Sequence, residues 1–386
     1  MIMRVLSISC GRSDLGILAP VWQALTDQAG VELHVLLTGA HVSDDTAGRA
    51  ALPEGAVAHT AGADLGGANA AAATDAMASI LEATGQLALR LKPDRALVIG
   101  DRLDMFSATL GLVPLNVPIV HLHGGELTYG ALDDRIRHSI TKLAHLHCAA
   151  TVQAAMRIAA MGEEPWRIAV TGAPGLDTLI ALPALGQDEF ARDVGLPSVA
   201  GLRLVTVHPE TNSRAPLAAL DAVLTALAVT PGTSLITAPN ADPGSAEAQR
   251  RIDDFVAGQD NVVFLEALGA RLYPSALRHA SVMVGNSSSG IIEAGLFGLP
   301  VINVGARQDG RERAANVVDC SATVDDVVKK LADVPPRTAP SCPYGDGASA
   351  PRVAASVTGK YDPEKLLYKR FAVADGAGGT EFHAPW

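Results

Sequence analysis

The fold of this chain is indicated most clearly by the stretch Ala96-Leu-Val-Ile-Gly-Asp-Arg-Leu-Asp-Met-Phe-Ser-Ala-Thr-Leu-Gly-Leu112, which Pro118-Ile-Val-His121 follows closely. Ala96–Ile99 is a short apolar run typical of a buried strand, and Pro118–His121 is a second one. We expect a helix between them over Leu103–Leu112. A strand, a helix and another strand in this order form a βαβ unit, in which the two strands are parallel.

The same rhythm extends along the chain in both directions. The other runs expected to be buried strands are Arg4–Ser9, Glu32–Leu37, Ile168–Thr171, Leu202–Val207, Ser234–Ala238, Val262–Leu265, Ser281–Val284 and Val301–Val304. The amphipathic stretches expected to be helices are Ile17–Gln28, Ala70–Leu91, Gln153–Met161, Pro216–Ala228, Ala246–Ala257 and Gly290–Phe297. The rhythm falters over residues 175–198, where we expect a linker. The pattern predicts an α/β protein with two doubly wound, mostly parallel sheets.

Two domains also suit the length of 386 residues, and each would be large enough to bury a core. We expect a Rossmann-like N-terminal domain over residues 1–178 and a Rossmann-like C-terminal domain over residues 179–356. Two such domains facing each other form a central cleft at the carboxyl ends of their strands, where ligands of open α/β sheets bind. The Gly-rich end of the chain, Gly376 to Trp386, is expected to be a loose tail.

The composition limits the partners of the chain. A net charge of −11 argues against a broad nucleic-acid surface, while leaving room for a local cationic pocket that binds a phosphorylated small molecule. The four cysteines are scattered without CxxC spacing, which argues against a disulfide framework or a zinc site. Met1–Cys10 has the character of a first strand rather than a signal peptide, and no uncharged run approaches the roughly 18–20 residues that span a bilayer. We therefore expect a soluble, cytoplasmic protein.

The segment that follows Pro118–His121 is the densest in titratable groups. Within 22 residues it contains His121, His123, Glu126, Asp133, Asp134, Arg135, Arg137, His138 and Lys142. So many such groups directly after a buried strand favour an active site. The alternative is that they cap and salt-bridge the helix that follows. Gly124-Gly125 permits a tight turn, and no spacing here matches a metal-binding helix such as HExxH, so we expect no metal.

Two other strand-end loops in the first half contain candidate ligand groups. Asp101 follows a strand directly after a glycine, which would place its carboxylate at the cleft; the alternative is an N-cap of the next helix. Gly11-Arg12-Ser13-Asp14 follows the first strand. Its backbone N–H groups and the Arg12 guanidinium could bind phosphate, or Asp14 could merely cap the helix.

The second half contributes a histidine and a small-residue loop. His208 lies at the tip of a strand that Pro209 ends, with a structural role as the alternative. Val284-Gly-Asn-Ser-Ser-Ser-Gly-Ile-Ile-Glu-Ala294 is a strand, a loop and a helix, whose hydroxyl and N–H groups could bind phosphate or simply cap the helix. Glu293 could accept hydrogen bonds from a ribose diol. The candidates for nucleotide binding are Ser287, Ser288, Ser289, Gly290, Glu293, Arg307, Arg311 and Arg313.

These segments together, in this order, resemble the UDP-N-acetylglucosamine 2-epimerase family, and most closely its hydrolysing branch. The resemblance rests on Gly100-Asp101-Arg102, His123-Gly-Gly-Glu126, Asp133-Asp134-x-x-Arg137-His138-x-x-Thr141-Lys142, His208-Pro209-Glu210, Val284-Gly-Asn-Ser-Ser-Ser-Gly290-Ile-x-Glu293-Ala294 and Arg307-Gln308-x-Gly310-Arg311. It covers nearly the whole chain and extends to Pro343-Tyr344-Gly345-Asp346-Gly347. One such motif would be weak evidence, whereas the ordered set is specific.

The resemblance implies a GT-B-like architecture, with UDP bound mainly by the C-terminal half and the sugar chemistry contributed mainly by the N-terminal half. The last helix, here over residues 357–374, would cross back onto the N-terminal domain. In the implied reaction, UDP leaves C1 by anti elimination while a base removes the C2 proton, which gives a 2-acetamidoglycal. Water then adds to the double bond and gives the free 2-epimer. No redox cofactor is needed, and we expect no cofactor.

The resemblance also implies roles for single residues. Asp101 and Asp133 fall on catalytic carboxylates of the family, and His208 falls on a histidine that contacts the diphosphate or the leaving group. Arg12 falls on a phosphate-contacting arginine, and Glu293 falls on the ribose ligand.

The resemblance leaves open the roles of two arginines and of one turn. Arg102 and Arg137 are further substrate-binding candidates, and Arg137 and His138 also resemble supports for the helix. Some hydrolysing members have a carboxylate where this chain has His123, and this chain has one extra residue before Asp133. Either Glu126 supplies the missing carboxylate or His123 transfers the proton.

The resemblance leaves several alternatives open. Relatives of this type act on UDP-N-acetylglucosamine in sialic-acid synthesis, and others act on a UDP- or GDP-linked 2,4-diacetamido-2,4,6-trideoxyglucose in legionaminic-acid synthesis. Other hypotheses are a non-hydrolysing epimerase, a GT-B glycosyltransferase, which would need an acceptor, and a nucleotide-sugar sensor without turnover. Relatives are often dimers or tetramers, so a homo-oligomer is implied as well.

Overall fold

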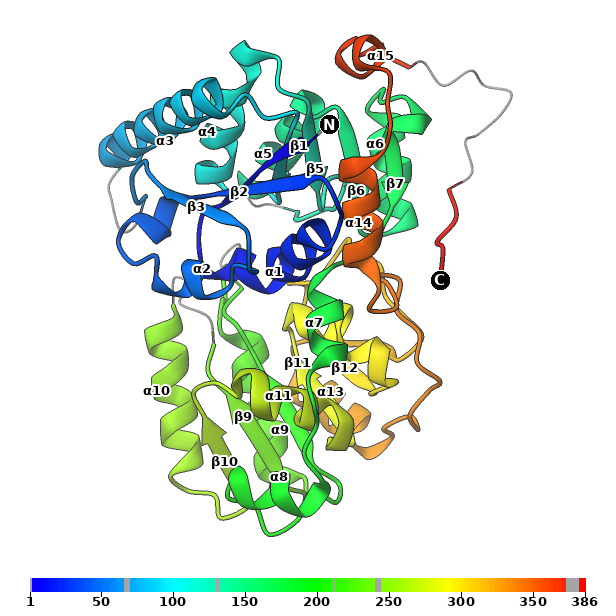
Figure 1. Ribbon diagram of the computed structural model, residues 1–386. Helices are drawn as coiled ribbons and strands as arrows, with labels where there is room; N and C mark the ends of the chain where they lie inside the picture. The colour runs from blue at the N-terminus through cyan, green and yellow to red at the C-terminus, as the bar shows by residue number, and fades with distance from the viewer. Residues whose placement is uncertain (1, 66–69, 130–131, 211–212, 240–243, 373–381) are drawn as a thin grey trace. The chain divides into compact units, whose positions relative to one another are not determined.

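The apolar runs of the chain form the strands of two parallel sheets, each in its own unit (Figure 1). The computed structural model describes residues 2–65, 70–129, 132–210, 213–239, 244–372 and 382–386. Unit 1 comprises Met1–Leu127, Ala131–Thr178 and Tyr344–Trp386, and unit 2 comprises Thr128–Gly130 and Leu179–Pro343. Unit 1 is therefore built from stretches that lie on both sides of unit 2 in the sequence.

Unit 1 contains a seven-stranded sheet with the strand order β3-β2-β1-β4-β5-β6-β7. Its strands are β1 Met3–Ser9, β2 Val31–Leu37, β3 Val57–Thr60, β4 Arg95–Ile99, β5 Ile119–Leu122, β6 Leu146–Ala149 and β7 Ile168–Val170. All neighbouring strands are parallel, so their carboxyl ends lie along one edge of the sheet. The strand order reverses between β1 and β4, which is the point where doubly wound sheets bind ligands.

Helices cover both faces of this sheet. The helices of unit 1 are α1 Arg12–Thr26, α2 Thr46–Ala50, α3 Ala70–Leu91, α4 Leu103–Leu112, α5 Leu132–Leu143, α6 Val152–Ala160, α14 Ser349–Thr358 and α15 Pro363–Leu367. The helix α7 Gly175–Ala181 begins in unit 1 and ends in unit 2. In Figure 1, α1 and α14 pack side by side against one face, while α3 and α4 cover the other. Because both faces are covered, strands such as β4 are buried along their whole length, and after its first residue, Arg95, β4 is continuously apolar.

Unit 2 contains a six-stranded parallel sheet with the equivalent strand order β10-β9-β8-β11-β12-β13. Its strands are β8 Arg203–Thr206, β9 Ser234–Thr237, β10 Val262–Leu265, β11 Val282–Gly285, β12 Val301–Val304 and β13 Val317–Cys320. Its helices are α8 Gln187–Asp193, α9 Ala218–Val229, α10 Ser245–Val256, α11 Gly269–His279, α12 Ser288–Ile292, the 3-10 turn η4 Ala294–Phe297 and α13 Val324–Ala332. Two separate buried clusters, one on each face of the sheet, form its core.

Every strand expected from the sequence is present, and each end lies within one residue of its expected position. Several elements were missed, among them the strands β3, β6 and β13 and the helices α2, α11, α13 and α14. β3 and β13 are partly exposed strands at the edges of their sheets, so they lack a continuous apolar run. β6 contains the buried polar residue His147, and α11 contains Pro274, which interrupts a helical pattern.

The stretch 175–198, expected to be a linker, contains the boundary between the two units, at Thr178 and Leu179, but part of it is helical. This stretch contains α7 and α8, which are anchored by the fully buried Phe190 and by Leu176, with 1% of its surface exposed. Pro183, Gly186, Gly195 and Pro197 lie in the non-helical connections, residues 182–186 and 194–198.

The C-terminal helix implied over residues 357–374 is not formed as one element. α14 already ends at Thr358, and α15 begins at Pro363, where proline is tolerated because a first-turn N–H has no helical partner. The side chain of Asp362 caps α15 by accepting the Lys365 N–H at 2.8 Å. Residues 382–386 contain no helix or strand, and the rest of the expected loose tail lies outside the described residues.

Among the helices that the structure describes, none combines the length and the apolar character needed to cross a bilayer.

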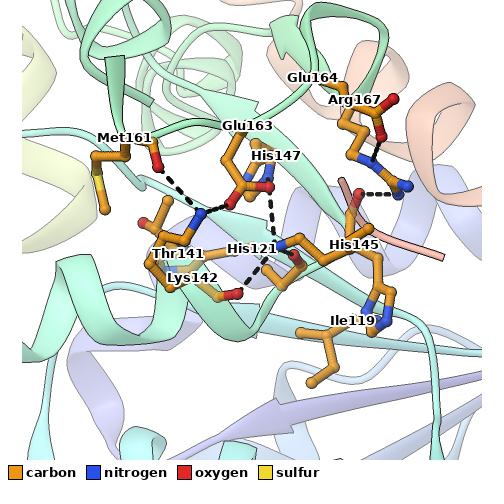
Figure 2. A network of polar contacts seen from close by, with 12 residues as sticks. Ile119, His121, Thr141, Lys142, His145, His147, Met161, Glu163, Glu164 and Arg167 are labelled. Carbon is orange, nitrogen blue, oxygen red and sulfur yellow. Dashed lines mark hydrogen bonds and ion pairs between the residues drawn. The ribbon is translucent and has the colours of Figure 1, made fainter. Parts of the chain in front are cut away.

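A buried carboxylate, that of Glu163, connects four parts of unit 1, and Figure 2 shows it beside His147 and Lys142. The Glu163 side chain is fully buried and accepts hydrogen bonds from His147 Nε2 at 3.1 Å, Lys142 Nζ at 2.5 Å and Lys369 Nζ at 2.9 Å. Burial alone would raise the pKa of Glu163, but hydrogen bonds from these three donors outweigh it and lower the pKa to about 2. The loop after α6, strand β6, helix α5 and the C-terminal segment are thereby joined around one negative charge.

This network predicts an acid-sensitive contribution to stability. Because the pKa of Glu163 is lower in the folded protein than its ordinary value of about 4.3, its ionisation stabilises the fold above that pH. As the pH falls toward 2, up to about 3 kcal/mol of unfolding free energy is lost from this group. We expect Glu163→Gln to be less stable than wild type at pH 7 and to lose less stability on acidification.

Urea unfolding at pH 7, 5 and 3 measures this difference. Glu82→Gln, a substitution of an exposed residue of α3, is the control and should behave like wild type. Equal losses on acidification in wild type and Glu163→Gln would contradict the prediction.

Candidate functional site

The carboxyl ends of β4 and β5 bring Asp101 and Arg137 together in unit 1. Arg137 Nη2 donates a hydrogen bond to Asp101 Oδ2, and Arg137 Nη1 donates to the backbone oxygen of Glu126 at 2.8 Å. Arg137 is only 4% exposed, and these acceptors belong to the protein itself. Two roles were expected for Arg137, substrate binding and support of the helix. Its position favours support, because its guanidinium holds the Asp101 carboxylate and is not exposed to solvent.

Asp101 does not cap the helix that follows it. The N-cap residue of α4 is Arg102, which makes no capping hydrogen bond through its side chain. The Asp101 carboxylate therefore faces Arg137, which disfavours the capping alternative.

His123 and Glu126 form a hydrogen-bonded pair in the turn after β5. His123 Nδ1 lies 2.6 Å from Glu126 Oε1, and both side chains are mostly buried. The turn needs its glycines, because a Cβ on Gly125, where φ is +75°, would lie 2.3 Å from the backbone oxygen of Ala154. The backbone of His123 itself has φ of +60°, an uncommon conformation for a residue with a side chain. The two candidate proton-transfer groups thus form one unit through which a proton can pass.

A second arginine–carboxylate pair orients Arg102. Its Nε and Nη2 donate to the two oxygens of Asp104 at 3.2 and 2.8 Å, and Asp104 is 1% exposed. Partial burial raises the pKa of Asp133, in the first turn of α5, and the charge of the nearby Arg102 opposes this rise. A raised pKa suits a carboxyl group that exchanges protons. Sequence reasoning missed Asp104, whose only signal was an acidic residue in the first turn of a helix.

The loop after β1 supports the capping alternative for Asp14. Its Oδ2 accepts the backbone N–H groups of Cys10 at 2.7 Å and Gly11 at 3.2 Å. These two N–H groups are consequently engaged by the protein. Arg12 is the first residue of α1 and is exposed, so its guanidinium can reach a ligand.

Asn286 fixes the position of His208 in unit 2. The Asn286 side chain is fully buried; its Oδ1 accepts the His208 N–H at 2.7 Å, and its Nδ2 donates to the His208 oxygen at 2.9 Å. The backbone oxygen of Asn286 accepts from Arg307 Nη1 at 3.2 Å and from Gln308 Nε2 at 2.8 Å. The strand ends of β8, β11 and β12 are thus joined through one asparagine.

A cavity of about 470 Å³ lies at the strand ends of unit 2. Residues that line it include His208, Thr237, Tyr273, Ser287, Ser289 and Glu293. Its volume is within the range of small-molecule sites.

Tyr273 organises one wall of this cavity, and sequence reasoning missed it. Its hydroxyl donates to Glu293 Oε2 and also contacts Ser289 Oγ. Burial and the negative charge of Glu293 raise the pKa of Tyr273, so the phenol stays protonated and can donate. Glu293 is thereby oriented toward the same space as the serines.

The expected serine loop caps its own helix in part. Ser287 is the N-cap of α12, and its hydroxyl accepts the Ser289 N–H at 3.4 Å. α12 has only five residues, so its dipole adds little, and hydroxyl and N–H groups must provide most of any anion binding. Gly290 is buried in the middle of α12, and Arg311 is half-buried in the loop after β12.

Comparison with known proteins identifies relatives along nearly the whole chain. Residues 23–358 match the family model for UDP-N-acetylglucosamine 2-epimerase. The chain is 31% identical to UDP-N,N'-diacetylbacillosamine 2-epimerase (hydrolyzing) of Legionella pneumophila, over 91% of this chain and 94% of that protein. It is 30% identical to UDP-N-acetylglucosamine 2-epimerase of Neisseria meningitidis, over 82% of this chain and 83% of that protein.

Solved structures share the fold. The S. aureus MnaA–UDP structure has a TM-score of 0.72 and 20% identity, over 91% of this chain and 95% of that chain. The Methanocaldococcus jannaschii UDP-GlcNAc 2-epimerase in complex with UDP-GlcNAc and UDP has a TM-score of 0.71 and 17% identity, over 92% of this chain and 99% of that chain. The expected fold class, two Rossmann-like α/β domains of the GT-B-like type, is confirmed.

The position of Asn286 predicts a large effect of its removal. Asn286→Ala leaves the buried N–H and C=O groups of His208 without their partner, at a cost of about 2–4 kcal/mol in unfolding free energy. Chemical denaturation measures this loss. Asn261→Ala is the control, because Asn261 is exposed and its side chain makes a single hydrogen bond to Gly232, so the expected loss is about 0.5 kcal/mol or less. Equal losses in the two variants would contradict the assigned role.

Proposed function

The chain belongs to the UDP-N-acetylglucosamine 2-epimerase family, and we propose that it is a hydrolysing 2-epimerase of a UDP-linked 2-acetamido sugar. The observation that supports this proposal most is the pairing of two proton-transfer groups, His123 and Glu126, close to the supported carboxylate of Asp101. Elimination followed by hydration needs groups that remove one proton and deliver another, and it needs no redox cofactor.

Asp101 and Asp133 are the proposed acid–base carboxylates of the elimination. One removes the poorly acidic C2 proton while the C1–O bond to UDP breaks, which leaves a 2-acetamidoglycal. Arg137 keeps the Asp101 carboxylate in place, and Arg102 adds positive charge beside Asp133. Positioned carboxylates of this kind contribute about 10²–10⁴-fold each to such proton transfers.

The His123–Glu126 pair is the proposed group for hydration. Glu126 takes a proton from water that adds at C1, and His123 shares it through their hydrogen bond. The carboxyl group of the Asp101 and Asp133 pair that did not take the first proton enters protonated and delivers its proton to C2 on the opposite face. The products are the free 2-epimer and UDP, so atoms and charge balance with one water consumed.

Unit 2 is the proposed nucleotide-binding half. Glu293, oriented by Tyr273, would accept hydrogen bonds from the ribose diol in the cavity at the strand ends. His208, with the serine loop and Arg307, would contact the diphosphate. Arg12 and Arg311 are further proposed phosphate ligands.

Two sugars are candidate substrates. UDP-N-acetylglucosamine would give N-acetylmannosamine for sialic-acid synthesis, and a UDP- or GDP-linked 2,4-diacetamido-2,4,6-trideoxyglucose would give the corresponding sugar for legionaminic-acid synthesis. The Neisseria relative is 30% identical to this chain and supports the first candidate. The Legionella relative is 31% identical and supports the second. We propose a cytoplasmic homo-oligomer, a dimer or a tetramer, for either substrate.

Product analysis in heavy water tests the reaction class. The proposal expects UDP and a free 2-acetamido sugar with deuterium at C2, in the absence of any acceptor, from one member of a panel of UDP- and GDP-linked sugars. An equilibrium of two nucleotide sugars without release of UDP would indicate the non-hydrolysing reaction. Release that depends on an acceptor would indicate a glycosyltransferase, and binding without turnover would indicate a sensor.

The carboxylate roles predict matched losses of turnover. Asp101→Asn, Glu126→Gln and Asp133→Asn should each lower kcat by at least ~100-fold while leaving the fold intact. Asp94→Asn is the control, since Asp94 lies at the opposite end of β4, where it accepts the Arg4 N–H at 2.7 Å. Steady-state kinetics, with circular dichroism to verify folding, measure the effect. Wild-type turnover in Glu126→Gln would remove Glu126 from the mechanism.

A further inference from the structure

The C-terminal segment Asp362–Ala372 contacts the end of α5 through Lys369. Lys369 Nζ donates to the backbone oxygens of Lys142 at 2.8 Å and Ala144 at 2.5 Å, and it lies 2.9 Å from Glu163 Oε2. The last carbonyl groups of a helix lack partners within the helix, and a cation there also meets the negative end of the helix dipole. Lys369 therefore caps α5 from a position 227 residues beyond Lys142 in the sequence.

Arg167 fixes the segment that carries Lys369. The Arg167 side chain is fully buried and donates to the backbone oxygens of Lys365 at 2.8 Å, Leu366 at 2.9 Å and Tyr368 at 3.0 Å. The N–H of Ala372 donates to the oxygen of Gly162 at 2.8 Å. Lys369 is thus held between two backbone attachments on the same unit.

The other end of α5 carries the proposed chemistry. Asp133 lies in its first turn, and Arg137, one turn further, holds Asp101. In its last turn, Lys142 donates to Glu163 Oε1 at 2.5 Å and to the oxygen of Met161 at 3.0 Å. Figure 2 shows Lys142 pointing toward Glu163 and Met161. A helix of 12 residues is a stiff rod of about 18 Å, so a shift at one end moves the other.

A second contact connects α5 to the Gly100–Asp101 turn. His121 is fully buried; its Nε2 lies 2.8 Å from the Gly100 oxygen, and its Nδ1 lies 3.2 Å from Thr141 Oγ1 on α5. Burial lowers the pKa of His121 to about 3, so it is neutral at physiological pH. The placement of α5 therefore bears on Asp101 through both Arg137 and His121.

We propose that Lys369 is a positioning residue for the acid–base site. By capping α5 and pairing with Glu163, it holds the helix in the position at which Arg137 orients Asp101 and the first turn presents Asp133. Lys369 acts through α5 and does not contact the substrate. This inference rests on the proposed function and assigns a part in that reaction to the C-terminal segment.

The test compares Lys369→Met with Lys365→Met in the full-length protein. Lys365 lies in the same segment, but its side chain is exposed and its Nζ lies over the Trp166 ring at 4.6 Å, away from α5. Lys369→Met should lower kcat by about 10- to 100-fold with KM within about twofold of wild type, because a misplaced catalytic group costs turnover more than binding. Lys369→Arg, which retains the charge and donors, should recover most of kcat. Lys365→Met should match wild type.

The pH profile separates positioning from simple loss of stability. If Arg137 no longer orients Asp101, a carboxylate loses a neighbouring cation, so the acid limb of the kcat profile of Lys369→Met should move to higher pH. Circular dichroism at each pH gives the folded fraction, and kcat is expressed per folded protein, because the loss of a Glu163 partner can itself make the variant unfold at higher pH. Wild-type kcat and pH profile in folded Lys369→Met would overturn the inference, as would an equal loss in Lys365→Met. If Lys369→Met does not fold, Lys369→Gln is measured by the same criteria.

Hydrogen exchange distinguishes failure of this inference from failure of the proposed function. Amides in a peptide covering residues 132–143 should exchange faster in Lys369→Met than in wild type and Lys365→Met, whether or not any substrate is turned over. Wild-type protein without turnover on any nucleotide sugar would contradict the proposed function alone. Unchanged exchange in α5 would overturn the positioning role.

Discussion

Parallel pairing of short buried strands is the constraint on which the rest of the structure depends. Because every strand in a sheet points the same way, the loops after β1, β4 and β5 lie along one edge, and so do the loops after β8, β11 and β12. Residues that are far apart in the sequence, such as Asp101 and Arg137, are therefore in contact at this edge. Two buried side chains, Arg137 and Asn286, then fix these loops.

The sequence predicts the sheets well because parallel strands covered on both faces are continuous apolar runs, and such runs need no tertiary context to be recognised. Its failures have physical causes. Edge strand β3 has one half-solvated side, β6 contains a histidine that only a buried partner, Glu163, makes tolerable, and α11 contains a proline. In β6 a contact distant in the sequence overrides the local pattern, whereas β3 and α11 were missed because exposure and a proline weaken the pattern itself.

The candidate site was predictable where a functional group follows a strand, since position along the chain then fixes position in space. Asp101, the His123–Glu126 pair and His208 are of this kind. Asp104 and Tyr273 lie within helices, and their importance comes from the groups they orient, Arg102 and Glu293. A supporting residue has no signature of its own in a single sequence, because its partner is brought to it only by the folded chain.

The discontinuity of unit 1 has a consequence for biosynthesis. Residues 344–386, which supply α14 beside α1 and the lysine that caps α5, leave the ribosome only after unit 2 has been made. The nascent N-terminal half therefore emerges without the helix that packs beside α1, whereas every strand and helix of unit 2, up to α13, has by then been made. Unit 2 can therefore complete its fold before unit 1 does. Until the final helices are synthesised, the incomplete N-terminal half exposes apolar surface that favours aggregation unless chaperones bind it.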